Sequence, residues 1–266
     1  MNTKREEIIM DDPTKRFSDR VDNYLKYRPR YPKELLTFLL EEKIIQETSI
    51  LADIGSGTGF FTELLLESGC QVFAVEPNKE MREAAEELLK GQARFTSVDG
   101  PAEATALKDN NIDFISVAQA FHWFDKEKTQ EEFLRILKPG GYLALVWNNR
   151  IKEDIPFQVG YNDLLIKYCP GSAKTNHYKI TYDQIVEFYG GTDVQIFRCT
   201  NKQILDFEGL KGRLFSSSYT PKEDDPNYQP LLSALKDLFD KHQVNGQVTM
   251  EYKTKMHYGR MNPNQE

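Results

Sequence analysis

Two hydrophobic patterns alternate along the first 150 residues of the chain. Short apolar runs of strand length are followed by longer segments in which apolar residues recur at helical spacing. The strand-like runs are SILADIG, QVFAVEP, ARFTSVDG, IDFISVAQA and GYLALVW, and the helical segments are FFTELLLES, NKEMREAAEELLK and DKEKTQEEFLRILKP. This alternation predicts an α/β fold, doubly wound, with a mostly parallel sheet and helices on both of its faces.

The pattern changes at both ends of this region. Before it, a polar and aromatic segment contains Pro29 and Pro32 and leads into a helix expected over residues 33–42. After Asn148, irregular helical segments precede two further strand candidates, DVQIFRCTNKQILDF and QVTMEYKTKMHY, with the helix candidate YQPLLSALKDLFDKH between them. These two strands would complete a seven-stranded sheet, but the pattern leaves their order open.

We therefore expect one domain over residues 1–266. Its core is predicted at about 35–150, with an N-terminal cap at 1–34 and a partial helical lid carrying substrate elements at about 151–225. A parallel sheet binds ligands outside the carboxyl ends of its strands, so the site is expected at that edge.

Composition restricts the partners of such a domain. The 266 residues carry a formal net charge of −7, which disfavours a nucleic-acid partner because affinity for phosphates depends on Lys and Arg. Cys70, Cys169 and Cys199 are widely spaced, which favours neither a disulfide framework nor a metal site. No signal peptide and no apolar run of roughly 18 residues is found, so a cytoplasmic protein without a membrane partner is expected.

A glycine-rich turn is the first candidate for chemistry. Gly55, Gly57 and Gly59 alternate between a strand-like run and a helix-like run, where the backbone can approach a ligand closely. Glu76 ends the next strand, where a carboxylate can accept hydrogen bonds from the hydroxyls of an adenosine ribose. A tight turn and a solvated strand end would explain each feature separately, but their combination favours a nucleoside cofactor.

The sequence of the turn, D-I-G-S-G-T-G, narrows the choice of nucleoside. The dinucleotide fingerprint requires a third glycine where this chain has Phe60, and the ATP-binding phosphate loop is absent. Asp53 precedes the first glycine and could accept a hydrogen bond from an ammonium group. S-adenosylmethionine carries such a group on its aminoacyl tail, whereas NAD has none there.

Several longer stretches carry a resemblance to a known family. LADIGSGTGFFTELL, VFAVEPNKEM, GPAEAT, IDFISVAQAFHWFD and EEFLRILKPGGYLALVWNNR resemble successive motifs of class I S-adenosylmethionine-dependent methyltransferases. More narrowly, they resemble the methyltransferase type 11 group, which includes trans-aconitate methyltransferase-like proteins. The resemblance covers about residues 17–150 and implies a Rossmann-like fold, with S-adenosyl-L-methionine as cofactor and S-adenosyl-L-homocysteine as product.

The resemblance implies a role for residues that match the motifs. The predicted cofactor-binding residues are Tyr24, Arg28, Asp53, Gly55, Ser56, Gly57, Thr58, Gly59, Glu76, Pro77, Met81, Ala102, Glu103, Gln119 and Ala120. Within this set, Arg28 and Tyr24 would face the cofactor carboxylate, and Gln119 would face the sulfonium. Pro101 replaces the Asp that the family often carries, which leaves Glu103, Asp99 or the backbone to accept from the adenine amine. The alternatives are structural roles: Arg28 at the end of a helix, Tyr24 in packing, and Gln119 in a hydrogen bond at a strand end.

The predicted acceptor site follows the fourth and fifth strands of the core. Phe121, Trp123, Phe124 and Asn148 are the substrate-binding candidates, although the aromatic residues could instead pack the next helix. His122 is the candidate catalytic residue, with a structural role as the alternative. A later polar stretch, RLFSSSY, is either a cavity wall or a plain loop.

The leading interpretation is an enzyme that transfers a methyl group from S-adenosylmethionine to a small-molecule acceptor by in-line displacement, without a metal. The alternatives are a methyltransferase acting on RNA or protein, a non-catalytic S-adenosylmethionine-binding module and, disfavoured by Phe60, an NAD-dependent dehydrogenase. The acceptor, the need for a general base and the oligomeric state are left open by the sequence.

Overall fold

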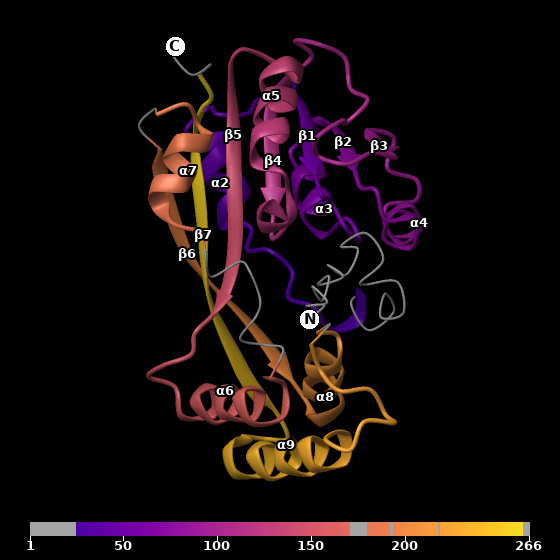
Figure 1. Ribbon diagram of the computed structural model, residues 1–266, viewed down its shortest axis with the longest axis vertical. Helices are drawn as coiled ribbons and strands as arrows, with labels where there is room; N and C mark the ends of the chain where they lie inside the picture. Colours follow the sequence, from indigo (N-terminus) through magenta and orange to yellow (C-terminus); the bar gives the residue numbers. More distant parts are fainter. Residues whose placement is uncertain (1–24, 171–179, 192–193, 218, 263–266) are drawn as a thin grey trace, which may run out of the picture.

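The structure is a computed structural model that describes residues 25–170, 180–191, 194–217 and 219–262. Figure 1 shows a twisted sheet flanked by helices, with a second group of helices below it. Within the described residues, no helix combines the length and the apolar character that crossing a bilayer requires.

Seven strands form one sheet. They are β1 (Ile50–Ile54), β2 (Gln71–Val75), β3 (Phe95–Val98), β4 (Ile112–Ala118), β5 (Leu137–Arg150), β6 (Gln195–Leu205) and β7 (Val248–Arg260). Their order is β3-β2-β1-β4-β5-β7-β6, with β1 to β5 parallel and β7 antiparallel to both β5 and β6. The predicted α/β fold with a mostly parallel seven-stranded sheet is therefore confirmed, and the order of the last two strands is now settled.

The helices are α2 (Glu34–Glu41), α3 (Phe60–Leu66), α4 (Lys79–Leu88), α5 (Lys126–Ile136), α6 (Pro156–Tyr168), α7 (Tyr182–Phe188), α8 (Phe207–Phe215) and α9 (Tyr228–His242), with a short 3-10 turn, η2, at Phe121–Trp123. The expected extension of α5 to Pro139 was wrong. Leu137 already has extended backbone angles and begins β5. The residue before a proline avoids the helical region, which helps to end the helix before Pro139.

Side chains of the strands feed two cores, one on each face of the sheet. Leu51 packs with α2 and α3, whereas Ala52 and Ile54 pack with α5 and α7. Neighbouring strand residues point to opposite faces, so a strand that is buried on both sides reads as a continuous apolar run. This explains why SILADIG and IDFISVAQA could be recognised from sequence.

A third core lies away from the main part of the sheet. Strands β5, β6 and β7 run on beyond the other strands toward α6, α8 and α9 (Figure 1). Leu165, Leu214, Leu235 and Met250 are among its buried members. We call α6, α8, α9 and the strand ends they cover the cap. Helix α7, at residues 182–188, packs on the sheet instead, although the predicted lid at 151–225 included it.

A segment at residues 27–31, here called the strap, crosses from the cap to the sheet. Gln203 donates from Nε2 to the carbonyl oxygen of Tyr27 at 3.0 Å. Asn201 and Asn148 both donate to the carbonyl oxygen of Arg30, at 2.7 and 3.4 Å. Side-chain amides from β5 and β6 therefore hold a segment that is far away in sequence.

Candidate functional site

The glycine turn lies between β1 and α3, at the carboxyl edge of the parallel strands. Gly55, Gly57 and Gly59 have φ of +67°, +56° and +84°, a region that suits glycine. The amides of Gly55 and Ser56 donate to the carbonyl oxygen of Val75 at 2.8 and 3.1 Å, which fastens the turn to β2. The backbone is thus fixed in a conformation that leaves a concave bend beside β2.

The first two glycines of the turn serve different purposes. A Cβ atom on Gly55 would lie 2.6 Å from the Cβ of Ala120, so close packing excludes a side chain there. A Cβ atom on Gly57 would meet none of the described residues within 4 Å. Open space therefore lies directly over the backbone of Gly57, and a cofactor group can rest against it.

Glu76 follows β2 and faces this turn. Its Oε2 atom accepts from the amide of Gly57 at 2.9 Å, and its Oε1 atom accepts from the amide of Asn78 at 2.9 Å. Burial raises the pKa of the carboxyl, while these two amide bonds act in the opposite direction. Each carboxylate oxygen keeps a further acceptor position, so the geometry suits a ligand with adjacent hydroxyl groups.

Asp53 lies beneath the turn and is fully buried. Thr62 donates to its Oδ2 atom at 2.7 Å, and Ser116 donates to its Oδ1 atom at 2.8 Å. Burial raises the pKa of Asp53 to about 6. In this geometry the carboxylate joins β1 to α3 and β4 and is covered by protein, rather than open to an ammonium group.

Thr62 and Ser116 were not identified from the sequence. Ser116 did leave a signal, because it is a polar residue in the middle of the apolar run IDFISVAQA. Thr62 left none, since it falls on the first helical turn after the glycines, where polar residues are common.

The predicted adenine-side residues lie around the end of β2 and the start of α4. Met81 is buried, and its amide donates to the Oδ1 atom of the capping residue Asn78 at 2.9 Å. Ala102 is buried in the core, and Glu103 accepts from the amide of Asp125 at 2.8 Å. The Nη1 atom of Arg82 donates a hydrogen bond to the carbonyl oxygen of Glu76 at 2.9 Å and lies 3.5 Å from the carbonyl oxygen of Pro77. Thr58 is buried in the glycine turn itself.

Gln119 and Ala120 follow β4 on the other side of the turn. Gln119 has a φ of +60°, a costly conformation for a residue with a side chain, and its Nε2 atom donates to the carbonyl oxygen of Asn148 at 3.1 Å. Ala120 packs against Gly55. The Phe124 ring also lies next to Gly55, whereas Trp123 and His122 are half-buried, with ring centroids 4.8 Å apart.

Two predicted substrate residues have other roles in this structure. Phe121 is fully buried, with its ring 4.7 Å from Phe188, so it packs the core and is not open to a substrate. Asn148 is also buried, because it accepts from Thr254 at 2.9 Å and donates to the strap. Position at a strand end does not show what covers a side chain, and here Phe188 covers Phe121 while Thr254 and the strap engage Asn148.

Of the two residues predicted to bind the cofactor carboxylate, the structure describes only Arg28. Tyr24 lies outside the described residues. Arg28 belongs to the strap, and its Nη2 atom donates to the carbonyl oxygen of Ser216 at 3.1 Å and lies 3.4 Å from the Ser217 hydroxyl. Arg28 thus joins the strap to the end of α8, where the RLFSSSY stretch lies.

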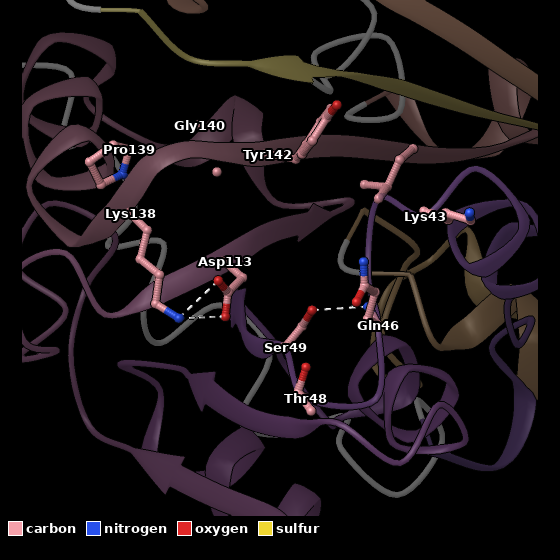
Figure 2. A pocket seen from close by; sticks show the side chains of 11 residues that line it. Lys43, Gln46, Thr48, Ser49, Asp113, Lys138, Pro139, Gly140 and Tyr142 are labelled. Carbon is pink, nitrogen blue, oxygen red and sulfur yellow. Dashed lines mark hydrogen bonds and ion pairs between the residues drawn. The ribbon is translucent and has the colours of Figure 1, made fainter.

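A separate polar hollow of about 390 Å³ lies at the opposite edge of the sheet. Figure 2 shows Lys138 directed at Asp113, with 2.8 Å between its Nζ atom and each carboxylate oxygen. Ser49 precedes β1, and Asp113 and Lys138 begin β4 and β5. This hollow is therefore at the amino ends of the strands and is not part of the site at the glycine turn.

Comparison with known proteins identifies the domain around this turn. Residues 52–145 match the model of a family described as "Methyltransferase domain". An uncharacterized methyltransferase-like protein of Schizosaccharomyces pombe is 35% identical over 158 residues, which cover 58% of this chain and 59% of that protein. An uncharacterized methyltransferase of Mycobacterium tuberculosis is 39% identical over 134 residues, covering 50% of this chain and 52% of the relative. Thus the matches span little more than half the length of these curated relatives.

Another relative and two solved structures match a larger share of the chain. A second S. pombe protein, named an uncharacterized methyltransferase, is 29% identical over 87% of this chain and 91% of its own. A solved structure from Anaeromyxobacter dehalogenans, provisionally named a type II methyltransferase, has a TM-score of 0.66 and 22% identity, and covers 90% of this chain and 100% of its own. A phosphoethanolamine N-methyltransferase of Haemonchus contortus has a TM-score of 0.53 and 16% identity, with 91% of this chain and 57% of its own covered.

The strand order, the glycine turn with Glu76 and the matched residues 52–145 lead to one conclusion. Residues 52–145 are therefore similar to the cofactor-binding region of S-adenosylmethionine-dependent methyltransferases.

Proposed function

We propose that the chain as a whole is a methyltransferase that methylates a small-molecule acceptor by in-line displacement. The observation that carries this proposal is the open space over Gly57 beside Glu76, whose carboxylate oxygens are oriented by two backbone amides. A nucleoside fits this arrangement, since its ribose hydroxyls would meet the free acceptor positions of Glu76. S-adenosylmethionine, when bound, supplies a methyl group that its sulfonium makes electrophilic.

The protein's part in the reaction is to bind, align and exclude water. The turn residues 55–59 would support the cofactor from below, Glu76 would hold its ribose, and Pro77, Met81, Ala102 and Glu103 would surround the adenine. Gln119 and Ala120 would lie along the sulfonium side. Arg28 and Tyr24 remain candidates for its carboxylate, while the buried Asp53 would brace the turn through Thr62 and Ser116. Holding the acceptor in line with the methyl group supplies much of the rate enhancement.

Several observations favour a small acceptor over RNA or a protein. The net charge is −7, and hydrogen bonds of Arg28 and Gln203 hold the strap against the cap. The structurally similar H. contortus enzyme was solved with phosphomonomethylethanolamine and S-adenosylhomocysteine. A trans-aconitate methyltransferase-like activity and a cytoplasmic location remain parts of this proposal. So does the division into a core at about 35–150, an N-terminal segment at 1–34 and a helical lid at about 151–225.

We propose that His122 takes a proton from the substrate if the group that becomes methylated is a hydroxyl, an amine or an acidic carbon. Trp123 and Phe124 would line the acceptor site next to it. A carboxylate acceptor would need no base, so replacing His122 distinguishes these cases. His122→Gln should reduce kcat for a protonated acceptor and leave kcat for a carboxylate acceptor unchanged.

Calorimetric titration tests the cofactor part of the proposal. S-adenosylmethionine and S-adenosylhomocysteine should bind the purified chain at micromolar concentration, and NAD should not bind. Transfer of an isotope-labelled methyl group to members of a small-molecule library would then separate an enzyme from a non-catalytic binding module. If neither adenosyl ligand binds, the proposed function is wrong.

A further inference from the structure

Two arginines in the cap have no acidic partner in the part of the chain that the structure describes. Arg150 ends β5, and Arg213 lies on α8; both are half-buried. Among the residues that the structure describes, neither guanidinium forms an ion pair, and the buried Nη1 atom of Arg150 has no hydrogen-bond partner. The guanidinium of Arg213 makes one hydrogen bond to the described chain, from Nε to the Tyr252 hydroxyl at 3.4 Å.

Tyrosines bring these two arginines to the same place. The Arg150 guanidinium lies over the ring of Tyr161 on α6, 4.5 Å from the ring centre. Arg150 and Tyr252 face each other across the β5–β7 ladder, so both project from the same face of the sheet. Tyr161 is buried, and both arginines act electrostatically on its hydroxyl. Four elements of the cap thus converge on one polar cluster of Arg150, Tyr161, Arg213 and Tyr252.

Packing alone does not account for this cluster. A guanidinium that is taken partly out of water is normally stabilised by a carboxylate or by several acceptors. The chain has 41 acidic residues against 34 basic ones, so acidic partners are plentiful. The described neighbours are instead tyrosines, which can accept or donate but carry no charge at neutral pH. Cation–π contact with Tyr161 stabilises one face of Arg150 but leaves its buried Nη1 atom without an acceptor among the described residues.

The cluster lies close to the predicted reaction centre. Gln119 joins the end of β4 to the backbone of Asn148 through a 3.1 Å hydrogen bond. Arg150 is two residues further along β5, or about 7 Å at the usual rise of a strand. A molecule of metabolite size could therefore contact Arg150 at one end and present its other end beside Gln119.

We propose that Arg150 and Arg213 bind an oxyanion, a carboxylate or phosphate, on the methyl acceptor, with the hydroxyl of Tyr161 completing the site. This inference rests on the proposed function and names the class of its substrate as an anionic small molecule. The planar fork of a guanidinium suits both kinds of oxyanion, because it can donate two parallel hydrogen bonds.

The test measures stabilisation of the full chain by citrate and by inorganic phosphate, each with and without S-adenosylhomocysteine. Sodium chloride at the same ionic strength serves as the reference. An anion at ten times its Kd should raise Tm by about 2–4 °C. The anion that gives the larger saturable shift identifies the carboxylate or the phosphate as the preferred group.

The variants are R150Q and R213Q, with R198Q as the matched control. Arg198 is an exposed arginine on β6, so its replacement removes the same charge without touching the cluster. We expect R150Q and R213Q to weaken anion binding about tenfold or more, the effect of losing a charge-assisted hydrogen bond, and R198Q to behave like the wild type. R150K and R213K repeat the test with the charge retained, in case a glutamine variant does not fold.

The outcomes separate this inference from the proposed function. The oxyanion site would be overturned if citrate and phosphate raised Tm no more than sodium chloride does. It would also be overturned if they raised Tm equally in the wild type, R150Q and R213Q. Stabilisation by S-adenosylhomocysteine that persists in R150Q and R213Q would leave the proposed function intact in that case. If S-adenosylhomocysteine fails to stabilise the wild type, the proposed function fails, while the anion titration still decides the role of the two arginines.

Discussion

The carboxylate of Glu76 is bound by two backbone amides and still has acceptor positions to offer. Replacing it with Gln keeps the size but removes the charge. We expect Glu76→Gln to weaken S-adenosylhomocysteine by about 1.5–3 kcal/mol, the range for hydrogen bonds to a charged group. Calorimetric titration would measure the change in Kd.

Glu80→Gln is the matched control for this prediction. Glu80 is exposed on α4, only four residues away, and the substitution makes the same change in charge. Equal Kd values for the Glu76→Gln, Glu80→Gln and wild-type chains would show that Glu76 does not hold the ribose. Circular dichroism would establish that each variant keeps its fold.

The contact between Glu76 and the glycine turn could be predicted because it depends on a local pattern. Glu76 and the three glycines occur at fixed places relative to two strands, so their proximity followed from the parallel sheet. The burial of Phe121 and Asn148 could not be predicted, because it depends on Phe188, Thr254 and the strap, all distant in sequence. No local pattern encodes such contacts.

At the scale of elements, the glycine turn can be compared with another turn of the same fold. Gly57 and Gly140 both have positive φ, and a Cβ atom at either would meet none of the described residues within 4 Å. Alanine at either position should therefore cost about 1–2 kcal/mol of backbone strain and little more. Only Gly57→Ala should also lose S-adenosylhomocysteine affinity, because its methyl group enters the space where the cofactor rests.

Chemical unfolding and ligand titration of the two variants would check this prediction. Gly140 is at the far edge of the sheet, beside the polar hollow, so Gly140→Ala should bind S-adenosylhomocysteine like the wild type. Normal binding by Gly57→Ala would mean that the open space over this glycine is not used.

Most elements could be predicted because their hydrophobic periods are clear and their connections are short. The order of β6 and β7 could not, since both read as edge strands and an antiparallel insertion has no local signature. The predicted lid at about 151–225 includes α7, which packs on the sheet. It leaves out α9, which packs in the cap. An amphipathic helix shows that it has a buried face, but not which core it covers.

At the scale of the whole molecule, two buried groups make the stability depend on pH in opposite directions. Burial raises the pKa of Asp53 to about 6 from 3.8, so its contribution is present below pH 3.8 and is lost as the pH rises through 6. Burial, followed by Lys255 and Arg198, lowers the pKa of His257 to about 4 from 6.5. Its contribution is present above pH 6.5 and is lost as the pH falls through 4.

At about 1.4 kcal/mol per pKa unit, each group changes the free energy of unfolding by about 3 kcal/mol. The two effects should nearly cancel between pH 4 and 6 in the wild type. Asp53→Asn should therefore lose stability toward pH 4, and His257→Gln should gain stability toward pH 4. Chemical unfolding at several pH values would measure these slopes, and parallel profiles for all three chains would contradict the assignment.

The placement of β7 between β5 and β6 also has a consequence for synthesis on the ribosome. Strand β6 pairs only with β7, and one edge of β5 is filled only by β7, yet residues 248–260 emerge after all the other strands. Until then the nascent chain exposes an open edge of β5, a place where unrelated strands can add. Emergence of β7, rather than emergence of the cofactor-binding residues, should therefore be the step that makes the chain resistant to aggregation.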